Sequence, residues 1–446
     1  MLSVYLPWPM PATWPWNAHL HLARAAALAL SCALISNPAQ AQAGPDLSMA
    51  QAVQLALAQS RRLEAANWQI SAAREMAQAA AQRPDPVIRF GVNNMPVNGA
   101  ERFSLNRDFM TMRTLGVAQE WTRDAKLQAR SARYEKEAEA LDSQRLESRS
   151  HIRRDAALAW LARSFQERLL VLQLRQRDEA RMQIDAAELA YRNGRGPQND
   201  VLAAHLALAH AGDQIARTTL QLATSKTRLA RWIGSAAESS LAPAPSFASL
   251  PFYADQLDVH LQNHPQLDFM RKQEAMAQAD LALARANLQA DWSVELMWSQ
   301  RGPAYSNMLS VNLSVPLQWD QARRQNRELA AKMASVAQMR AERDDATLAH
   351  TAEVRAMLQE WQSGRERLLH YDERILPLAT ARIAAANASY RGGVTGSATL
   401  GEALAARRSS IEPEMERLQL EWDNARLWVE LVYLLPPETA TATVQP

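Results

Sequence analysis

Side chains that could bind a metal ion or act as acids and bases are scattered along this sequence. Nine of its 446 residues are His, and one, Cys32, is Cys. His260 and His264 are four residues apart, a spacing that can place two imidazoles on one helix face, but Pro265 follows at once and no third ligand is near. A single Cys excludes an internal disulfide and a cysteine-based zinc site. We therefore expect neither a metal nor a cofactor.

Sequence motifs of common enzymes are absent from the chain. It contains no phosphate-binding loop, no G-x-S-x-G element and no convincing catalytic triad. Its 49 Lys and Arg residues nearly balance 47 Asp and Glu residues, so the charge gives no reason to expect a nucleic-acid partner. We expect a protein that is not an enzyme and does not bind nucleic acid.

The amino-terminal residues 1–43 have the features of a cleaved signal peptide. Arg24 precedes the short apolar run Ala25–Ile35, and A-x-A sites follow at 39–41 and 41–43. Acylation of Cys32 is the weaker alternative, because the three residues before it form a poor lipobox. No later segment has the run of about 20 apolar residues that a membrane-spanning helix needs. An exported membrane protein of this sequence would therefore need a β-barrel.

Two halves of the chain, residues 44–233 and 254–435, share one order of features. Each half is expected to hold a helix, two strands, a very long helical stretch and a final helix. The sequence predicts these elements at 47–82, 87–94, 110–119, 124–191 and 199–232, and again at 254–289, 292–299, 308–315, 320–390 and 397–434. Residues 234–253 are expected to be a linker, and residues 436–446 a loose tail.

The helical stretches carry a seven-residue apolar period, as at Leu208, Ile215, Leu222 and Leu229. This period is typical of left-handed coiled-coil packing. A single helix over 124–191 would be about 100 Å long, which is too long for a compact globule. The expected fold class is therefore mainly α with a small β part, in which long coiled-coil helices accompany four strands.

The strand segments alternate between apolar and polar residues, although 110–119 does so less cleanly. Their lengths are close to the 9–11 residues with which a strand crosses an outer membrane, so charged strand residues should face a barrel interior rather than lipid. These charges are Arg89, Arg113 and Glu295. Aromatic residues near the strand ends are expected at the membrane interface: Trp121, Trp292 and Trp319. The alternative is an ordinary amphipathic sheet on a soluble core.

Four strands are too few to close a barrel. Open edges are not tolerated in lipid, and small barrels start at about 8 strands. If the strands span a membrane, several chains must share one barrel. Two chains would give an interior filled by side chains, whereas three would leave a pore.

In its order of elements, the chain resembles the TolC-type outer-membrane efflux proteins. The local signatures are P-D-P-x-x-x-x-G at 84–91, the Y-x-x-G turns at 191–194 and 390–393, and His264-Pro265. The resemblance covers nearly all of the mature sequence. It implies a homotrimer with a twelve-stranded barrel in outer-membrane lipid and a twelve-helix tunnel across the periplasm. It also implies two partners, a periplasmic adaptor and an inner-membrane RND transporter.

The resemblance further implies roles for particular residues. The two turns would be the tips where the adaptor docks: Tyr191, Arg192, Gly194, Arg195, Tyr390, Arg391 and Gly393. Members of the family often have acidic residues six or nine positions after the turn glycine, near the entrance. This chain has Asp200, Thr399 and Glu402 there, so its acidic pattern is incomplete. The alternative is that the glycines serve only to turn the chain and that the acidic residues are there only because the helix dipole favours them.

The expected function is a passive outer-membrane exit duct of a tripartite efflux pump. The segment Gly91–Pro96 resembles members from heavy-metal export systems, which makes heavy-metal cations the expected cargo. Multidrug efflux and type I protein secretion are the alternatives within this class. A periplasmic coiled-coil scaffold without a pore is the alternative from another class.

Overall fold

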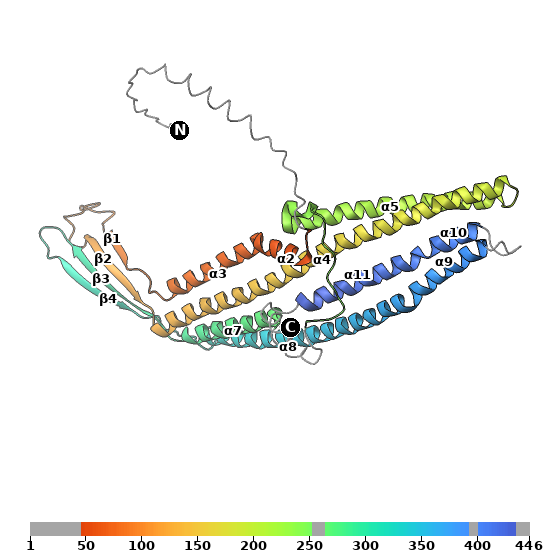
Figure 1. Ribbon diagram of the computed structural model, residues 1–446. Helices are drawn as coiled ribbons and strands as arrows, with labels where there is room; N and C mark the ends of the chain where they lie inside the picture. The colour runs from red at the N-terminus through yellow and green to blue at the C-terminus, as the bar shows by residue number, and fades with distance from the viewer. Residues whose placement is uncertain (1–45, 252–263, 392–399, 434–446) are drawn as a thin grey trace, which may run out of the picture. The chain divides into compact units, whose positions relative to one another are not determined.

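A computed structural model describes residues 46–251, 264–391 and 400–433 of the chain. These residues form long helices and one four-stranded sheet (Figure 1). Among their helices, none combines the length and apolarity that crossing a membrane as a helix requires. The predicted leader 1–43, with Cys32, and the predicted tail 436–446 lie outside the described residues.

The sheet consists of β1 (Val87–Asn93), β2 (Met112–Trp121), β3 (Trp292–Gln300) and β4 (Met308–Ser314). All neighbours are antiparallel, and the strands lie in the order of the sequence. Each predicted strand is present, with its ends shifted by no more than two residues. Strands β1 and β4 are the two edges of the sheet, and neither is paired on its outer side within the described chain.

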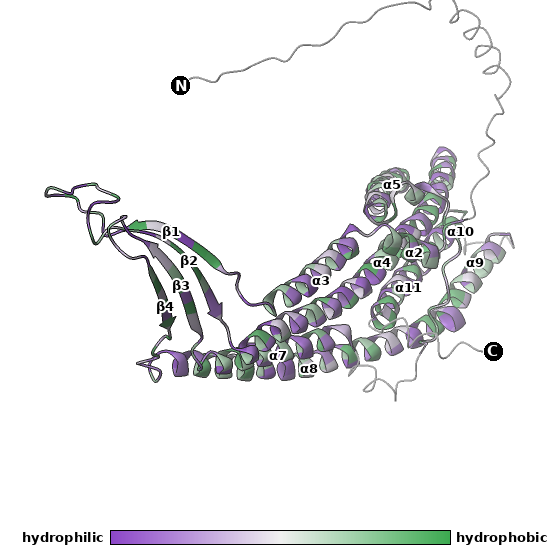
Figure 2. Ribbon diagram, turned by 90° about the vertical axis from the view of Figure 1, so that its left-hand side faces the viewer, coloured by the Kyte–Doolittle hydropathy of each residue, from purple (hydrophilic) through white to green (hydrophobic). Residues whose placement is uncertain are grey.

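The strand register sorts the side chains onto two unlike faces. Ile88, Val117, Leu296 and Val311 share one row, and the next row on that face is also apolar, with Phe90, Leu115, Trp298 and Leu309. This apolar face is open, since Phe90 is 85% exposed and Leu309 is 68% exposed. The opposite, polar face carries Arg89, Glu295, Ser310 and Asn312. In Figure 2 the strands accordingly carry both hydrophobic and hydrophilic residues.

Strand β2 leads into α4 (Asp124–Arg192), a helix of 69 residues that is about 100 Å long. Helix α5 (Gln198–Ile233) returns along α4. The residues buried in this seam are small and seven apart: Ala204, Ala211, Thr218 and Ser225. The predicted leucine and isoleucine positions 208, 215 and 222 are only partly buried beside it. Small seam residues allow the two helices to approach closely, with larger side chains at the flanks.

Three of the predicted continuous helices are interrupted. The first divides into α2 (Met49–Ala58) and α3 (Arg61–Ala80), because Ser60 starts a new helix by accepting a hydrogen bond from the Leu63 N–H at 3.3 Å. The second-half stretch divides into α8 (Gln325–His370), a π-helical turn (Tyr371–Ile375) and α9 (Leu376–Arg391). The last divides into α10 (Leu400–Ser409) and α11 (Ile411–Tyr433).

Proline explains the two interruptions in the second half. Pro377 follows the π-helical turn, and Pro413 follows the break at Ser410. Neither residue can donate the backbone hydrogen bond to the carbonyl four positions earlier, and each ring crowds that carbonyl. A regular α-helix therefore cannot pass through either point unchanged.

The main core lies where α2, α4, α5 and α11 meet. Trp160 of α4 is fully buried there, and its Nε1 donates to the Leu47 carbonyl at 2.9 Å. The predicted linker begins with a short 3-10 helix (Gly234–Glu238), and Leu241 pairs with Leu47 in a parallel bridge. These linker residues are therefore packed on the core. Helix α7 (Pro265–Ala286) packs against α4 and α8, and residues 252–263 lie outside the described chain.

Candidate functional site

An ion pair on the polar face of the sheet joins two of the predicted lumen charges. Arg89 Nη1 of β1 is 3.1 Å from Glu295 Oε1 of β3. The Asn312 amide of β4 donates to the other carboxylate oxygen at 3.4 Å. The register places both charged residues on the face opposite the apolar rows. The two residues therefore occupy the face that the alternation predicted for them.

The third predicted lumen charge, Arg113, is not on this face. The register aligns Arg113 with Val92 and Gln300, which places it on the apolar face at the end near the β1–β2 loop. Its Nε atom is buried and has no hydrogen-bond partner among the described residues. The expectation that Arg113 lies with Arg89 and Glu295 is wrong, because Arg113, Leu115 and Val117 alternate in one phase along β2.

Tryptophans mark the end of the sheet from which the helices continue. Trp121 and Trp292 are paired residues, and their rings stack with centroids 5.1 Å apart. Trp121 is the last residue of β2 rather than a residue beyond it. Trp319 follows β4 and is 89% exposed. The membrane-interface role of these tryptophans stays a prediction. Trp298 also lies on the apolar face, where it pairs with Leu309.

A largely buried ion pair fastens the sheet to the helices. Lys126 Nζ of α4 is 2.6 Å from Asp291 Oδ2, one residue before β3. The Arg123 backbone N–H donates to the other oxygen of Asp291 at 3.1 Å, and Lys126 also donates to the Gln289 carbonyl. The contact links residues from the two halves of the chain at the point where strands become helices. Local sequence patterns do not predict this ion pair, because the two residues are 165 positions apart.

The first predicted tip is the turn between α4 and α5. Gly194 has φ +67°, with open space where a Cβ would stand. Its N–H donates to the Tyr191 carbonyl, and the Arg195 N–H donates to the Ala190 carbonyl, both at 2.9 Å. Such left-handed closure of a helix end favours glycine. Tyr191 is exposed, and Arg192 forms an ion pair with Glu188 at 2.6 Å.

The second predicted tip is only partly described. Tyr390 is exposed and Arg391 is the last residue of α9, whereas Gly393 and Thr399 lie outside the described residues. Asp200 and Glu402 are in the first turns of α5 and α10. Acidic side chains are favoured there by the helix dipole. The gate role of Asp200, Thr399 and Glu402 stays a prediction.

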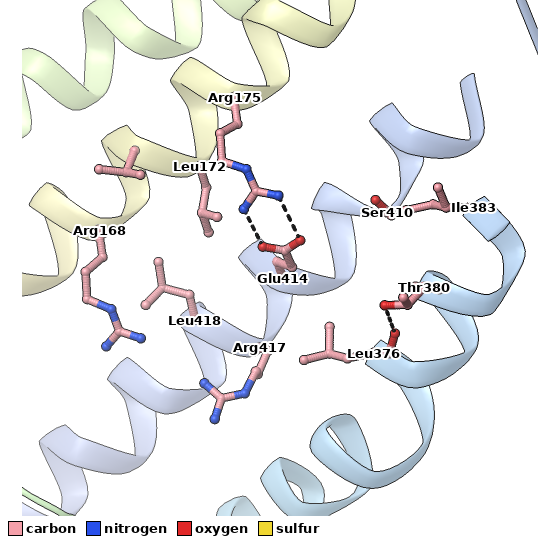
Figure 3. Close-up of a pocket in the computed structure, with 12 residues that line it drawn as sticks. Arg168, Leu172, Arg175, Leu376, Thr380, Ile383, Ser410, Glu414, Arg417 and Leu418 are labelled. Atoms are coloured by element: carbon pink, nitrogen blue, oxygen red, sulfur yellow. Dashed lines mark hydrogen bonds and ion pairs between the residues drawn. The ribbon is translucent and has the colours of Figure 1, made fainter. Parts of the chain in front are cut away.

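A groove of about 730 Å³ lies between α4, α9 and the α10–α11 region. Arg175 and Glu414 form a two-point ion pair across it, with N···O distances of 2.8 and 3.3 Å (Figure 3). Arg168 and Glu421 form another, at 2.6 and 3.0 Å. Burial opposes ionisation of Glu421, but Arg168 and Arg417 outweigh it and hold the pKa of the carboxyl below its usual value. These paired charges clamp α11 to α4.

A histidine junction, formed by His151 of α4, His264 at the start of α7 and His350 of α8, borders a cavity of about 260 Å³. The rings of His264 and His350 have centroids 4.2 Å apart. The Gln266 N–H donates to His264 Nδ1 at 3.3 Å, so this histidine caps α7. His350 is 7% exposed, and its Nε2 has no hydrogen-bond partner among the described residues.

The histidine junction disfavours positive charge. Burial, followed by the proximity of His350 and His151, lowers the pKa of His264 to about 3. Burial also lowers the pKa of His350. Within the described residues, no group of three or more His, Cys, Asp or Glu could hold a metal ion, and His260 lies outside them.

Neither a protein-family model nor a curated relative matches the sequence. Solved structures do match. CusC, described in connection with folding and transmembrane channel formation, has a TM-score of 0.69 at 16% identity over 87% of this chain and 92% of its own. The outer membrane protein VceC from Vibrio cholerae has a TM-score of 0.68 at 16% identity, covering 87% and 96%.

The open state of the Neisseria gonorrhoeae MtrE outer membrane channel also matches, with a TM-score of 0.68 at 13% identity. That match covers 87% of this chain and 88% of the other. The chain therefore shares the fold of these outer-membrane channels, and the predicted mainly α fold with a small sheet is confirmed. The TM-scores of 0.68 and 0.69 establish the shared fold, but at 13–16% identity the function has to be argued from the residues.

Proposed function

We propose that this chain is one subunit of a trimeric outer-membrane duct, with the apolar face of its sheet against lipid. The observation that carries the proposal is a sheet with one open apolar face and two unpaired edges. Unpaired strand edges are not tolerated in a bilayer, so β1 of one copy would pair with β4 of the next. Three copies would contribute twelve strands, enough to surround a pore.

The helices support the same proposal. Helix α4, about 100 Å long, continues directly from β2, and α8 follows β4. A coiled-coil wall of this length would extend the pore well beyond one membrane. A duct formed in this way would conduct passively, with the driving energy supplied by an inner-membrane RND transporter through a periplasmic adaptor. The turns at Gly194 and around Tyr390–Arg391 are the proposed adaptor contacts.

The cargo that we propose is heavy-metal cations. The argument is the likeness of Gly91–Pro96 to members from heavy-metal export systems. Deletion of the gene should then sensitise cells to copper, silver, zinc, cobalt or cadmium. Sensitivity to a drug panel alone would favour multidrug efflux, and failure to export a protein would favour type I secretion.

Val311 and Ser310 allow a direct test of the duct proposal. They are neighbours in the middle of β4, but Val311 belongs to the apolar face and Ser310 to the polar face. A charge facing mid-membrane lipid costs about 2–4 kcal/mol, whereas a charge facing a water-filled lumen costs little. Val311→Arg should therefore deplete trimers from the outer membrane, and Ser310→Arg should not.

The assay is cell fractionation followed by size analysis in mild detergent. Equal tolerance of Val311→Arg and Ser310→Arg would refute the assignment of the apolar face to lipid. Recovery of the wild-type chain as a soluble periplasmic monomer would refute the duct itself and favour the scaffold without a pore.

A further inference from the structure

The Arg89–Glu295 ion pair crosses an entire strand. Arg89 lies on β1 and Glu295 on β3, with β2 between them. Adjacent strands are about 4.8 Å apart, so the two backbones are separated by roughly 10 Å. The side chains meet only because they lie along the polar face instead of projecting away from it.

The residues of β2 beneath the pair leave room for this crossing. Gly116 pairs with Arg89, and Ala118 pairs with Glu295. These have the two smallest side chains available, so nothing longer than a methyl group stands between the two charges. Asn312 holds the far side of the carboxylate from β4. The polar face therefore carries one connected group of side chains from β1 to β4.

The charge inventory of the polar face follows from the register. Within the four strands, all in the described part of the chain, this face holds Arg89, Glu295 and, at its helix end, Glu120. Arg113 is on the other face. The middle of the polar face is therefore electrically neutral, because its only positive charge is matched by a carboxylate at 3.1 Å.

Resting on the proposed duct, we propose that the Arg89–Glu295 pair determines the ion selectivity of the barrel segment. When the two charges are paired, the lumen at this level should select neither cations nor anions. Removing either partner exposes a ring of three like charges, which attract oppositely charged ions and repel like-charged ones. The ion pair would thus prevent cations from binding to the Glu295 carboxylate as they pass through the barrel segment.

Reversal potentials in planar bilayers under a KCl gradient test this proposal. Glu295→Gln should shift the potassium-to-chloride permeability ratio toward chloride, and Arg89→Gln should shift it toward potassium. Three unit charges about 10 Å from the pore axis, screened over a Debye length of about 10 Å, should change the ratio roughly fourfold. The charge-swapped double variant Arg89→Glu/Glu295→Arg should return it to the wild-type value.

Arg113→Gln is the matched control, because it removes a charge from the apolar face and should leave the ratio unchanged. Channels with the wild-type ratio in both single variants would overturn the selectivity role and leave the duct standing. A change in the double variant as large as in the single variants would also overturn it. A wild-type chain that forms no channels would overturn both the selectivity role and the duct.

Discussion

Acid should weaken the histidine junction of α4, α7 and α8. The unfolded chain protonates His264 near its ordinary pKa of 6.5, whereas the folded chain does so only near pH 3. Between these values the unfolded state binds more protons, so the free energy of unfolding falls as the pH falls. The stabilisation is fully present above about pH 6.5 and is lost progressively toward pH 3. Protonation of His350 acts in the same direction, because its pKa is also lowered.

The size of the effect follows from the two pKa values of His264. At pH 5, protonation of the unfolded chain alone costs the folded state about 2 kcal/mol, and the limiting loss below pH 3 is about 5 kcal/mol. Other ionisable side chains, Glu147, Glu353 and Glu430, border the same cavity. A variant is therefore needed to isolate the contribution of His264.

His264→Asn is that variant, since Asn is also a favourable N-cap and can accept from the Gln266 N–H. Urea unfolding of the purified protein in detergent, followed by tryptophan fluorescence, would be measured at pH 7 and pH 5. The wild-type chain should lose about 2 kcal/mol more than His264→Asn between the two values. The reasoning is refuted if both chains lose the same amount, or if the wild-type chain gains stability at pH 5.

Two further substitutions have matched controls within the chain. Gly194→Val places a β-branched residue at φ +67°, which strains the backbone by about 1–2 kcal/mol. It should abolish the resistance of cells to the exported metal while trimers remain in the membrane. Gly212→Val, on the open side of α5, should keep resistance, and equal resistance in both would contradict the docking assignment. Lys126→Met removes the cation beside the largely buried Asp291, which keeps only its bond from the Arg123 N–H, and should cost about 2–3 kcal/mol in thermal or urea unfolding. Lys272→Met removes a more exposed pair and should cost no more than about 1 kcal/mol, so similar losses would be evidence against the Lys126 clamp.

Local periodicity predicted the elements of this fold well. The strands were found within two residues because the two-residue alternation reports which face of a sheet is apolar. Charge alone predicts that Arg113 lies with Arg89 and Glu295, whereas its phase with Leu115 and Val117 places it on the apolar face. The interruptions near Pro377 and Pro413 were also readable in principle, since proline breaks a helix wherever it falls inside one.

Contacts between distant segments could not be predicted in the same way. His264 meets His350, and Lys126 meets Asp291, only after the fold brings separate helices and strands together. The ion pairs between α11 and α4 are partly visible in the sequence. Arg168 and Arg175 are seven residues apart, and so are Glu414 and Glu421. Charges at this spacing indicate a coiled-coil flank, but the partner helix follows only from the topology.

The two open edges of the sheet create a kinetic hazard for a newly made chain. Until its edges are paired, each strand edge can template pairing with any extended segment, and the open apolar face favours aggregation. Strands β1 and β4 have seven residues each, against ten and nine for the inner strands, which shortens the exposed templates. If the chain assembles into the proposed trimer, its yield should therefore depend on the relative rates of assembly and aggregation, both of which rise with the concentration of newly made chains.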